Sequence, residues 1–137
     1  MKIQNYGENI LKYKLMELIE QEGDYKKFNH KGIKCEIKRQ ETMRHLCGYV
    51  YIPQDIQNYT EEDLDLYAHG GVTYHAVKDG YVVVGFDCAH GGDLVPEMFF
   101  RSGSVLGKYR DMKYVEEILM NMVDYVVDTM KLEENNE

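Results

Sequence analysis

Two stretches of the chain repeat apolar residues every three or four positions, the spacing of an amphipathic helix. The first spans about residues 6–22 and stops before Gly23, and its apolar stripe comprises Ile10, Leu11, Leu15, Leu18 and Ile19. The second follows Asp111, a potential helix cap, and its wider stripe comprises Tyr114, Val115, Ile118, Leu119, Met122, Val123, Val126, Val127 and Met130. A stripe this broad must cover a sheet, and it also favours homo-oligomerisation.

Four β-like segments lie between the two helices. Ile33, Cys35 and Ile37 alternate with charged residues, as in a strand with one solvated face, and residues 46–52 form an apolar run that ends at Pro53. Residues 72–77 and 81–88 flank Asp79-Gly80, a strong signal for the tight turn of a β-hairpin. The pattern predicts an α+β fold: an antiparallel sheet of about four strands, with an N-terminal helix and a long C-terminal helix packed on it.

Two polar connections complete this pattern. Residues 54–67 form a long loop with one helical turn after Thr60, whose hydroxyl would cap the backbone amide of Asp63. Residues 91–107 are rich in glycine and lack a clear period, so we expect an ordered loop beside the end of the hairpin.

The length of 137 residues suits one compact domain, 1–137, with a frayed tail at about 132–137. No apolar run approaches the roughly 20 residues of a membrane span. The N-terminus also lacks the form of a secretory signal. We therefore expect a cytoplasmic protein with no membrane partner.

The formal net charge of -8 argues against nucleic acid as a partner, because phosphate binding normally needs a basic surface. Mimicry of a nucleic-acid surface by the acids is a weaker alternative. The charge is uneven, however, and residues 1–45 contain a loose basic sector that could attract a small anion. A solvated strand face is the simpler interpretation. The sector comprises Lys26, Lys27, Lys31, Lys34, Lys38, Arg39 and Arg44.

The three cysteines, Cys35, Cys47 and Cys88, contain no C-x-x-C pair, which argues against a disulfide framework and a standard zinc knuckle. Cys35 and Cys47 are expected in the core, because free cysteine is among the most buried residue types. Strand alternation places Cys88 on the same inward face as Phe86.

Groups that titrate, ligate or hydrogen-bond gather between His69 and Asp93. The hairpin would bring residues 69–75 alongside residues 86–90, so the two halves of the cluster become neighbours. Paired glycines after His69 would let a ligand approach the backbone closely. We expect the functional site here. The other histidines outside the cluster, His30 and His45, are expected on the surface.

Three chemistries suit these residues. A divalent metal, possible but not required, would take its mixed nitrogen and oxygen ligands from His69, Asp87, His90 and Asp93, although the spacing matches no standard motif. Thiol catalysis would use Cys88, whose inward direction opposes it. Ligand recognition asks least of the geometry. In a purely structural alternative, Asp–His hydrogen bonds only pin the glycine-rich loop to the hairpin.

Four motifs of the chain resemble, in order and spacing, a widespread family of small uncharacterised bacteriophage and prophage proteins. The motifs are CGYVYIP (47–53), HGGVTY (69–74), GFDCAHGGD (85–93) and YRDMKYV (109–115), within residues 46–120. The resemblance implies the signature residues His69, Gly70, Gly71, Thr73, Tyr74, Asp87, Cys88, His90, Asp93, Tyr109 and Arg110. The chain departs from the family pattern at His75-Ala76, at 82–84 and at Gly91, which leaves His75 outside the expected site.

We therefore expect a phage-derived anti-defence protein that binds a small phosphorylated nucleotide-like ligand and sequesters an immune signal. Its ligand-binding residues would be His69, Gly70, Gly71, Thr73, Tyr74, Asp87, His90, Asp93 and Arg110. Arg110 is the phosphate partner among the following cations, which include Arg101 and Lys108, and Tyr74 offers a stacking surface. One alternative is a metal-dependent hydrolase or nuclease that uses the same groups together with Cys88. Another is an interaction protein that blocks a host macromolecule.

Overall fold

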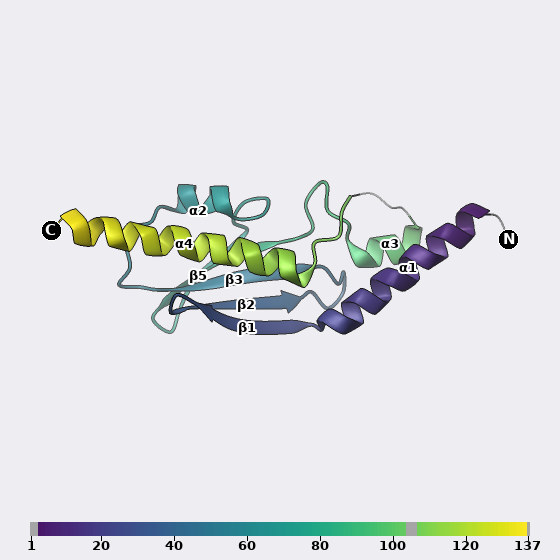
Figure 1. Cartoon of the computed structure of the whole chain (residues 1–137), viewed down its shortest axis with the longest axis horizontal. Helices are drawn as coiled ribbons and strands as arrows, with labels where there is room; N and C mark the ends of the chain where they lie inside the picture. Colours follow the sequence, from purple (N-terminus) through teal and green to yellow (C-terminus); the bar gives the residue numbers. More distant parts are fainter. Residues whose placement is uncertain (1–2, 104–106, 137) are drawn as a thin grey trace.

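A computed structural model, which describes residues 3–103 and 107–136, shows a five-stranded antiparallel sheet with one long helix laid across it (Figure 1). The elements are α1 (Ile3–Glu22), β1 (Tyr25–His30), β2 (Ile33–Arg39), β3 (Leu46–Pro53), α2 (Glu61–Tyr67), β4 (Tyr74–Lys78), β5 (Tyr81–Asp87), α3 (Pro96–Ser102) and α4 (Met112–Asn136). The strands lie in the order β1-β2-β3-β5-β4. The predicted α+β class is confirmed, with five strands instead of about four.

The predicted hairpin of β4 and β5 is confirmed. Lys78 pairs with Tyr81 across the two-residue turn, in which Asp79 and Gly80 have φ values of 53° and 86°. Positive φ at both central residues is the signature of a type I′ turn, whose twist matches that of the flanking strands. This turn aligns the start of β4 with the end of β5, where the candidate site lies.

The strand that the sequence pattern misses is β1. It pairs with β2 along its whole length, from Tyr25 opposite Lys38 to His30 opposite Ile33. Its turn is again of the primed type, with Lys31 at φ 50° and Gly32 at φ 83°. Because β1 is an edge strand with most of its residues exposed, it carries no apolar alternation that could reveal it.

The main core lies between one face of the sheet and α4. The sheet contributes Ile33, Cys35, Ile37, Leu46, Val50, Ile52, Val84 and Phe86, and α4 contributes Val115, Leu119, Met122, Val123 and Val126. These five helix side chains have no solvent exposure. The apolar stripe of α4 is therefore used on the sheet of its own chain, and it gives no further reason to expect a second copy.

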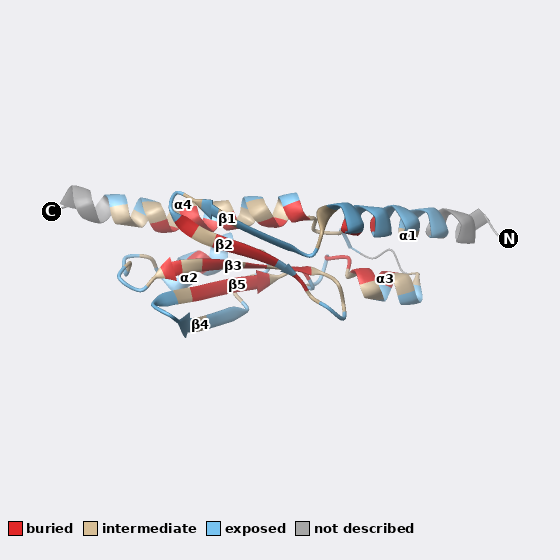
Figure 2. Cartoon of the chain, turned by 90° about the horizontal axis from the view of Figure 1, so that it is seen from below, coloured by how far each residue is buried: buried red, intermediate tan, exposed pale blue. Residues whose placement is uncertain are grey.

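The expected buried stripe of α1 is wrong in part. Leu15 and Ile19 are buried, but Ile10, Leu11 and Leu18 are exposed. In Figures 1 and 2, α1 extends beyond the end of the sheet, where α3 is its neighbour. The two buried residues join a second, small core that also contains Leu94 and Phe99. A helical period therefore identified α1 correctly but not what covers it.

Arg39 corrects the expectation of a solvated basic sector. Its side chain is only 4% exposed. It donates to the carboxylates of Glu22 at 3.0 Å and Asp24 at 2.9 Å, and to the hydroxyl of Tyr109 at 3.0 Å. Glu22 also accepts from the backbone amide of Met112 at 2.8 Å, at the start of α4. Arg39 thus joins the end of α1 to the start of α4 and cannot serve as a free anion-binding group.

The connections agree with the sequence only in part. Thr60 caps α2 and accepts from the amide of Asp63, as predicted. The expected loop at 91–107 contains α3, which Pro96 opens and Gly103, at φ 71°, ends. The expected frayed tail at 132–137 is helical to Asn136, and residue 137 lies outside the described residues. Among those described, no helix is long and apolar enough to cross a bilayer.

Gly48→Ala should lower the free energy of unfolding by about 1–3 kcal/mol, because it overpacks the contact between β3 and α4. A β-carbon at Gly48 would lie 2.9 Å from the Phe86 ring and 3.0 Å from Val115. Urea unfolding measures the effect. In the control Gly91→Ala, a β-carbon meets nothing within 4 Å, and the change should stay below about 0.5 kcal/mol. Equal stability of the two variants would contradict this packing.

Candidate functional site

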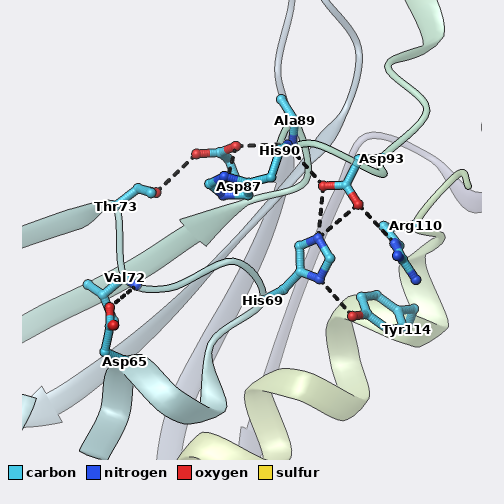
Figure 3. Close-up of polar contacts among 10 residues, drawn as sticks. All are labelled: Asp65, His69, Val72, Thr73, Asp87, Ala89, His90, Asp93, Arg110 and Tyr114. Carbon is cyan, nitrogen blue, oxygen red and sulfur yellow. Dashed lines mark hydrogen bonds and ion pairs between the residues drawn. The ribbon is translucent and has the colours of Figure 1, made fainter. Parts of the chain in front are cut away.

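The expected site residues come together where β5 ends and α4 begins (Figure 3). His69 lies between α2 and β4, Asp87 is the last residue of β5, and His90 and Asp93 follow in the next loop. Arg110 precedes α4 by two residues. Three segments that are far apart in the sequence thus supply the cluster.

The carboxylate of Asp93 is the centre of this cluster and is only 1% exposed. It accepts from His69 Nε2 at 2.8 and 2.9 Å, from Arg110 Nε at 2.9 Å and from the backbone amide of His90 at 3.0 Å. Burial by itself would raise the pKa of Asp93. The hydrogen bonds from His69, Arg110 and the amide of His90 outweigh it and hold the pKa below its ordinary 3.8. The group is an ionised, fully paired anchor.

His69 bonds through both ring nitrogens. Its Nε2 contacts Asp93, and its Nδ1 lies 2.7 Å from the hydroxyl of Tyr114 on α4. Because Asp93 is ionised, Nε2 of His69 carries a hydrogen and donates a hydrogen bond to it. When the ring is neutral, Nδ1 then accepts a hydrogen bond from the hydroxyl of Tyr114. The result is a chain of hydrogen bonds from carboxylate to imidazole to phenol, visible in Figure 3.

Asp87 and His90 form the more open half of the cluster, with side chains 30% and 31% exposed. Asp87 accepts from the hydroxyl of Thr73 and the amide of Ala89, each at 3.0 Å. His90 Nε2 lies 3.5 Å from Asp87 Oδ1, yet this nitrogen is buried and has no hydrogen-bond partner in the described part of the chain. This ring nitrogen therefore interacts with Asp87 through electrostatics and not through a hydrogen bond.

Gly70 explains how the His90 ring fits. It adopts φ 69°, and a β-carbon there would lie 2.4 Å from the imidazole Cδ2. The ring therefore packs directly against backbone that only glycine can provide. Gly71, at φ 90°, has a different role, because a β-carbon there would lie 3.0 Å from Asp65, whose carboxylate accepts from the amide of Val72 at 2.7 Å. Each glycine therefore makes room for a protein side chain, and the pair does not leave an open space.

Arg110 is the cation of the site, and its side chain is 23% exposed. Its Nε donates to Asp93, and its guanidinium carbon lies 4.9 Å from the centre of the Tyr114 ring. Within the described residues, neither terminal nitrogen has a hydrogen-bond partner. Asp93 and Tyr114 thus fix the plane of the guanidinium while its outer donors remain available.

Sequence reasoning missed His45, which is half-buried instead of lying on the surface. Its Nδ1 is buried without a hydrogen-bond partner among the described residues. Burial lowers the pKa of His45, while Asp87 and Asp93 act in the opposite direction through space. Since His45 directly precedes β3, and β3 pairs with β5, only the strand pairing could have revealed this neighbour.

The cysteines do not supply a nucleophile. Cys88 is 2% exposed, as alternation predicted, and burial raises the pKa of its thiol well above the ordinary value. Burial also raises the pKa of Cys47, which is only partly buried, to about 11. Both thiols therefore remain protonated near neutral pH, and thiol catalysis has no support.

The metal candidates His69, Asp87, His90 and Asp93 do not converge as ligands. Among the described residues no group of at least three His, Cys, Asp or Glu side chains is placed to hold a metal ion. The reason is geometric: Asp93 uses both oxygens on protein donors, and His69 uses both nitrogens.

Two residues of the expected region contact groups outside the cluster. Tyr74 is 46% exposed and contacts the Tyr49 ring edge to face, at 5.4 Å between centroids. His75 pairs with Glu61 of α2 at 3.0 Å. Beside that pair lies a shallow cavity of about 360 Å³ whose carboxylates make it unsuitable for phosphate, lined by Glu61, Glu62, Asp65, Val72, His75 and Val84.

Comparison of the chain with known proteins gave no match to a family model, to a curated protein or to a solved structure.

Asp93→Asn should lower the free energy of unfolding near pH 7 by about 3 kcal/mol, because it leaves buried donors without their anion. The folded pKa of Asp93 is lowered, so its contribution is complete above the unfolded value of 3.8 and is lost as pH falls through the folded value. The variant should therefore lose less stability than the wild type on acidification below about pH 4. Urea unfolding at several pH values measures both effects.

The exposed Asp55 provides the matched control. Asp55→Asn should change the unfolding free energy by less than about 0.5 kcal/mol and leave the acid dependence as in the wild type. Parallel acid limbs for wild type and Asp93→Asn would show that Asp93 is not the anchor described.

Proposed function

We propose that the protein binds a small phosphorylated, nucleotide-like ligand at the cluster around Arg110 and holds it without converting it. The observation that carries this proposal is the guanidinium of Arg110. Its Nε is fixed on the buried carboxylate of Asp93, and its terminal donors lack protein partners among the described residues. A planar fork held in this way is suited to the oxygens of a phosphate and loses little entropy on binding.

The open half of the cluster supplies a second set of polar contacts. Asp87 has lone pairs beyond those that Thr73 and Ala89 use, and a ribose hydroxyl is a suitable donor to them. Tyr74 lies opposite Gly85 across the hairpin. Gly85 is two positions before Asp87 in β5, so Tyr74 and Asp87 lie on the same face of the sheet. The exposed ring of Tyr74 offers a surface for a base. His69 and Asp93 position the other residues of the site. Their polar atoms are already hydrogen-bonded within the protein, so they are not the primary contacts of the ligand.

Sequestration accounts for this arrangement better than turnover does. A binding site benefits from rigid, satisfied groups, whereas a nucleophile or base must exchange partners during each cycle. From the motif resemblance we propose a phage-derived protein whose ligand is an immune signalling nucleotide of the bacterial host, captured in the cytoplasm. The resemblance supports the context and the guanidinium supports the ligand class.

Isothermal titration calorimetry against cyclic dinucleotides and ADP-ribose derivatives tests the proposal. At least one of these ligands should bind, and Arg110→Gln should weaken that affinity by about 10- to 150-fold, the loss expected for hydrogen bonds to a charged group. Arg101→Gln is the matched control, since Arg101 is 69% exposed and pairs with Glu97 on α3. Absence of heat from every ligand, with circular dichroism showing folded protein, would refute binding of this class.

Hydrolysis of the ligand is a second candidate because of one observation, the chain of hydrogen bonds Asp93–His69–Tyr114. An oriented base next to a hydroxyl is the arrangement that activates a nucleophile. If it operates, chromatography after incubation should detect product, and Tyr114→Phe should abolish its formation while the exposed Tyr13→Phe does not. Recovery of intact ligand from denatured wild-type protein would exclude this activity and support sequestration.

A further inference from the structure

The sheet face opposite α4 is not covered by any helix of the described chain. In Figure 1, α4 and α2 lie on one side of the sheet, and Figure 2, turned by 90°, shows the strands with the helices behind or beyond them. The most extensive helix-to-strand contacts of the described chain are those of α4 with β3 and β2. The open face is formed by alternate residues of the strands and is hereafter called the tyrosine–lysine face.

The strand register defines the composition of this face. Its aromatic residues are Tyr25, Tyr49, Tyr51, Tyr74 and Tyr81, and its lysines are Lys27, Lys34, Lys38 and Lys78. Among the residues that the structure describes, Glu36 and Asp87 are the carboxylates of these strand positions. Tyrosine is thus the aromatic residue and lysine the cation of this face in the described strands.

The rings form an ordered platform. Tyr51 meets Tyr81 edge to face, with centroids 6.1 Å apart, as Tyr49 meets Tyr74 at 5.4 Å. The lysines lie beside the same rings: Lys34 Nζ is 4.2 Å from the centre of the Tyr51 ring, and Lys38 Nζ is 5.6 Å from that of Tyr49. Aromatic surface and positive charge therefore alternate over a few ångströms.

Glu36 helps to build this platform instead of opposing it. It is 6% exposed and accepts from the hydroxyls of Tyr25 and Tyr51, and Lys38 Nζ lies 3.4 Å from it. Burial opposes ionisation, but the bonds from Tyr25, Tyr51 and Lys38 keep the pKa of Glu36 below its usual value. Its charge is thus buried, paired and used to orient two rings.

The charge of the face opposes that of the whole molecule. Four lysines face two carboxylates here, whereas the chain as a whole has a formal net charge of -8. A positive area on an acidic molecule selects an anionic partner. It also argues against a second copy on this surface, because symmetric pairing would set one net-positive face against another.

We propose that the tyrosine–lysine face binds single-stranded nucleic acid, with bases stacked on the tyrosines and phosphates on the lysines. Stacking on exposed rings combined with cations along the backbone is the general basis of single-strand binding by open sheets. A flat anionic membrane would use the lysines but has no planar group for the rings. The proposal revises the expectation from net charge, and it uses Tyr74 in common with the ligand site but not Arg110.

Fluorescence anisotropy of a labelled oligothymidine, and of its ribose counterpart, titrated with the full chain tests the proposal. Binding should weaken with salt, with a log–log slope that grows by about −0.7 for each phosphate contacted. Tyr81→Ala and Tyr74→Ala remove exposed rings and should each weaken binding at least about fivefold. Lys34→Ala should weaken it and reduce the salt slope by about one phosphate contact.

Matched controls lie outside the tyrosine–lysine face. Lys113→Ala on α4 and Tyr13→Ala on α1 remove exposed side chains of the same types and should leave binding unchanged. Arg110→Gln should also leave it unchanged, which separates this surface from the nucleotide site. Circular dichroism and urea unfolding confirm that each variant is folded.

Three outcomes would overturn the proposal. The first is no anisotropy change with folded protein at low salt. The second is binding that Lys34→Ala and Tyr81→Ala leave intact. The third is a preference for another occupant, either phosphatidylserine vesicles in co-sedimentation or a self-associated form in analytical ultracentrifugation, that the same two variants abolish.

Discussion

The buried carboxylate of Asp93 is the constraint on which the candidate site depends. An ionised group with 1% exposure is stable only if donors replace its lost water, and three segments of the chain supply them. The backbone is adapted to the same purpose. Gly107, at φ 86°, lies so close that a β-carbon would be 2.6 Å from the Asp93 carbonyl carbon, and Lys108 pairs with Asp93 as in a parallel strand. Removing the anion would therefore release the loop, His69 and Arg110 together.

A second buried charge network reaches the same place from the other side. Arg39 on β2 holds Glu22 at the end of α1, and Glu22 in turn accepts from the first amide of α4. Tyr109 bonds to both Arg39 and Glu22, and the next residue, Arg110, bonds to Asp93. The residues before α4 are thus clamped between two networks, which gives the guanidinium of Arg110 its fixed orientation.

The sequence predicted those parts of the fold that depend on short-range pattern. The turn at Asp79-Gly80, the cap at Thr60 and the α4 stripe follow from local chemistry that tertiary contacts reinforce. Most residues of the edge strand β1 are exposed to solvent, so its sequence does not alternate between apolar and polar residues. The cover of α1 could not be inferred either, because a helical period shows which residues share a face but not whether anything packs there.

The candidate site was predictable as a place but not as an arrangement. Strand pairing across one turn was enough to bring His69 towards His90. The role of Asp93 depends on Arg110, which precedes α4, and on Tyr114 in the first turn of α4. The sequence pattern predicts this helix but not where its start lies relative to the hairpin. His45 illustrates the same limit: it is close to Asp87 only because Cys47 and Asp87 pair across β3 and β5. Contacts between segments that are distant in the sequence therefore determine which charged groups lie close together.

Net charge misleads for a related reason. It sums over a surface, whereas a partner contacts one face. On the helix side, Lys26 of β1 pairs with Glu116, and Lys31 of the turn after β1 pairs with Asp124, so α4 neutralises both lysines. Lysines on the other face of the same strands lie over tyrosine rings, with one paired carboxylate among them. The two-residue period of a strand thus separates one basic sector into a structural half and an exposed half. Only the exposed half is available to an anionic partner.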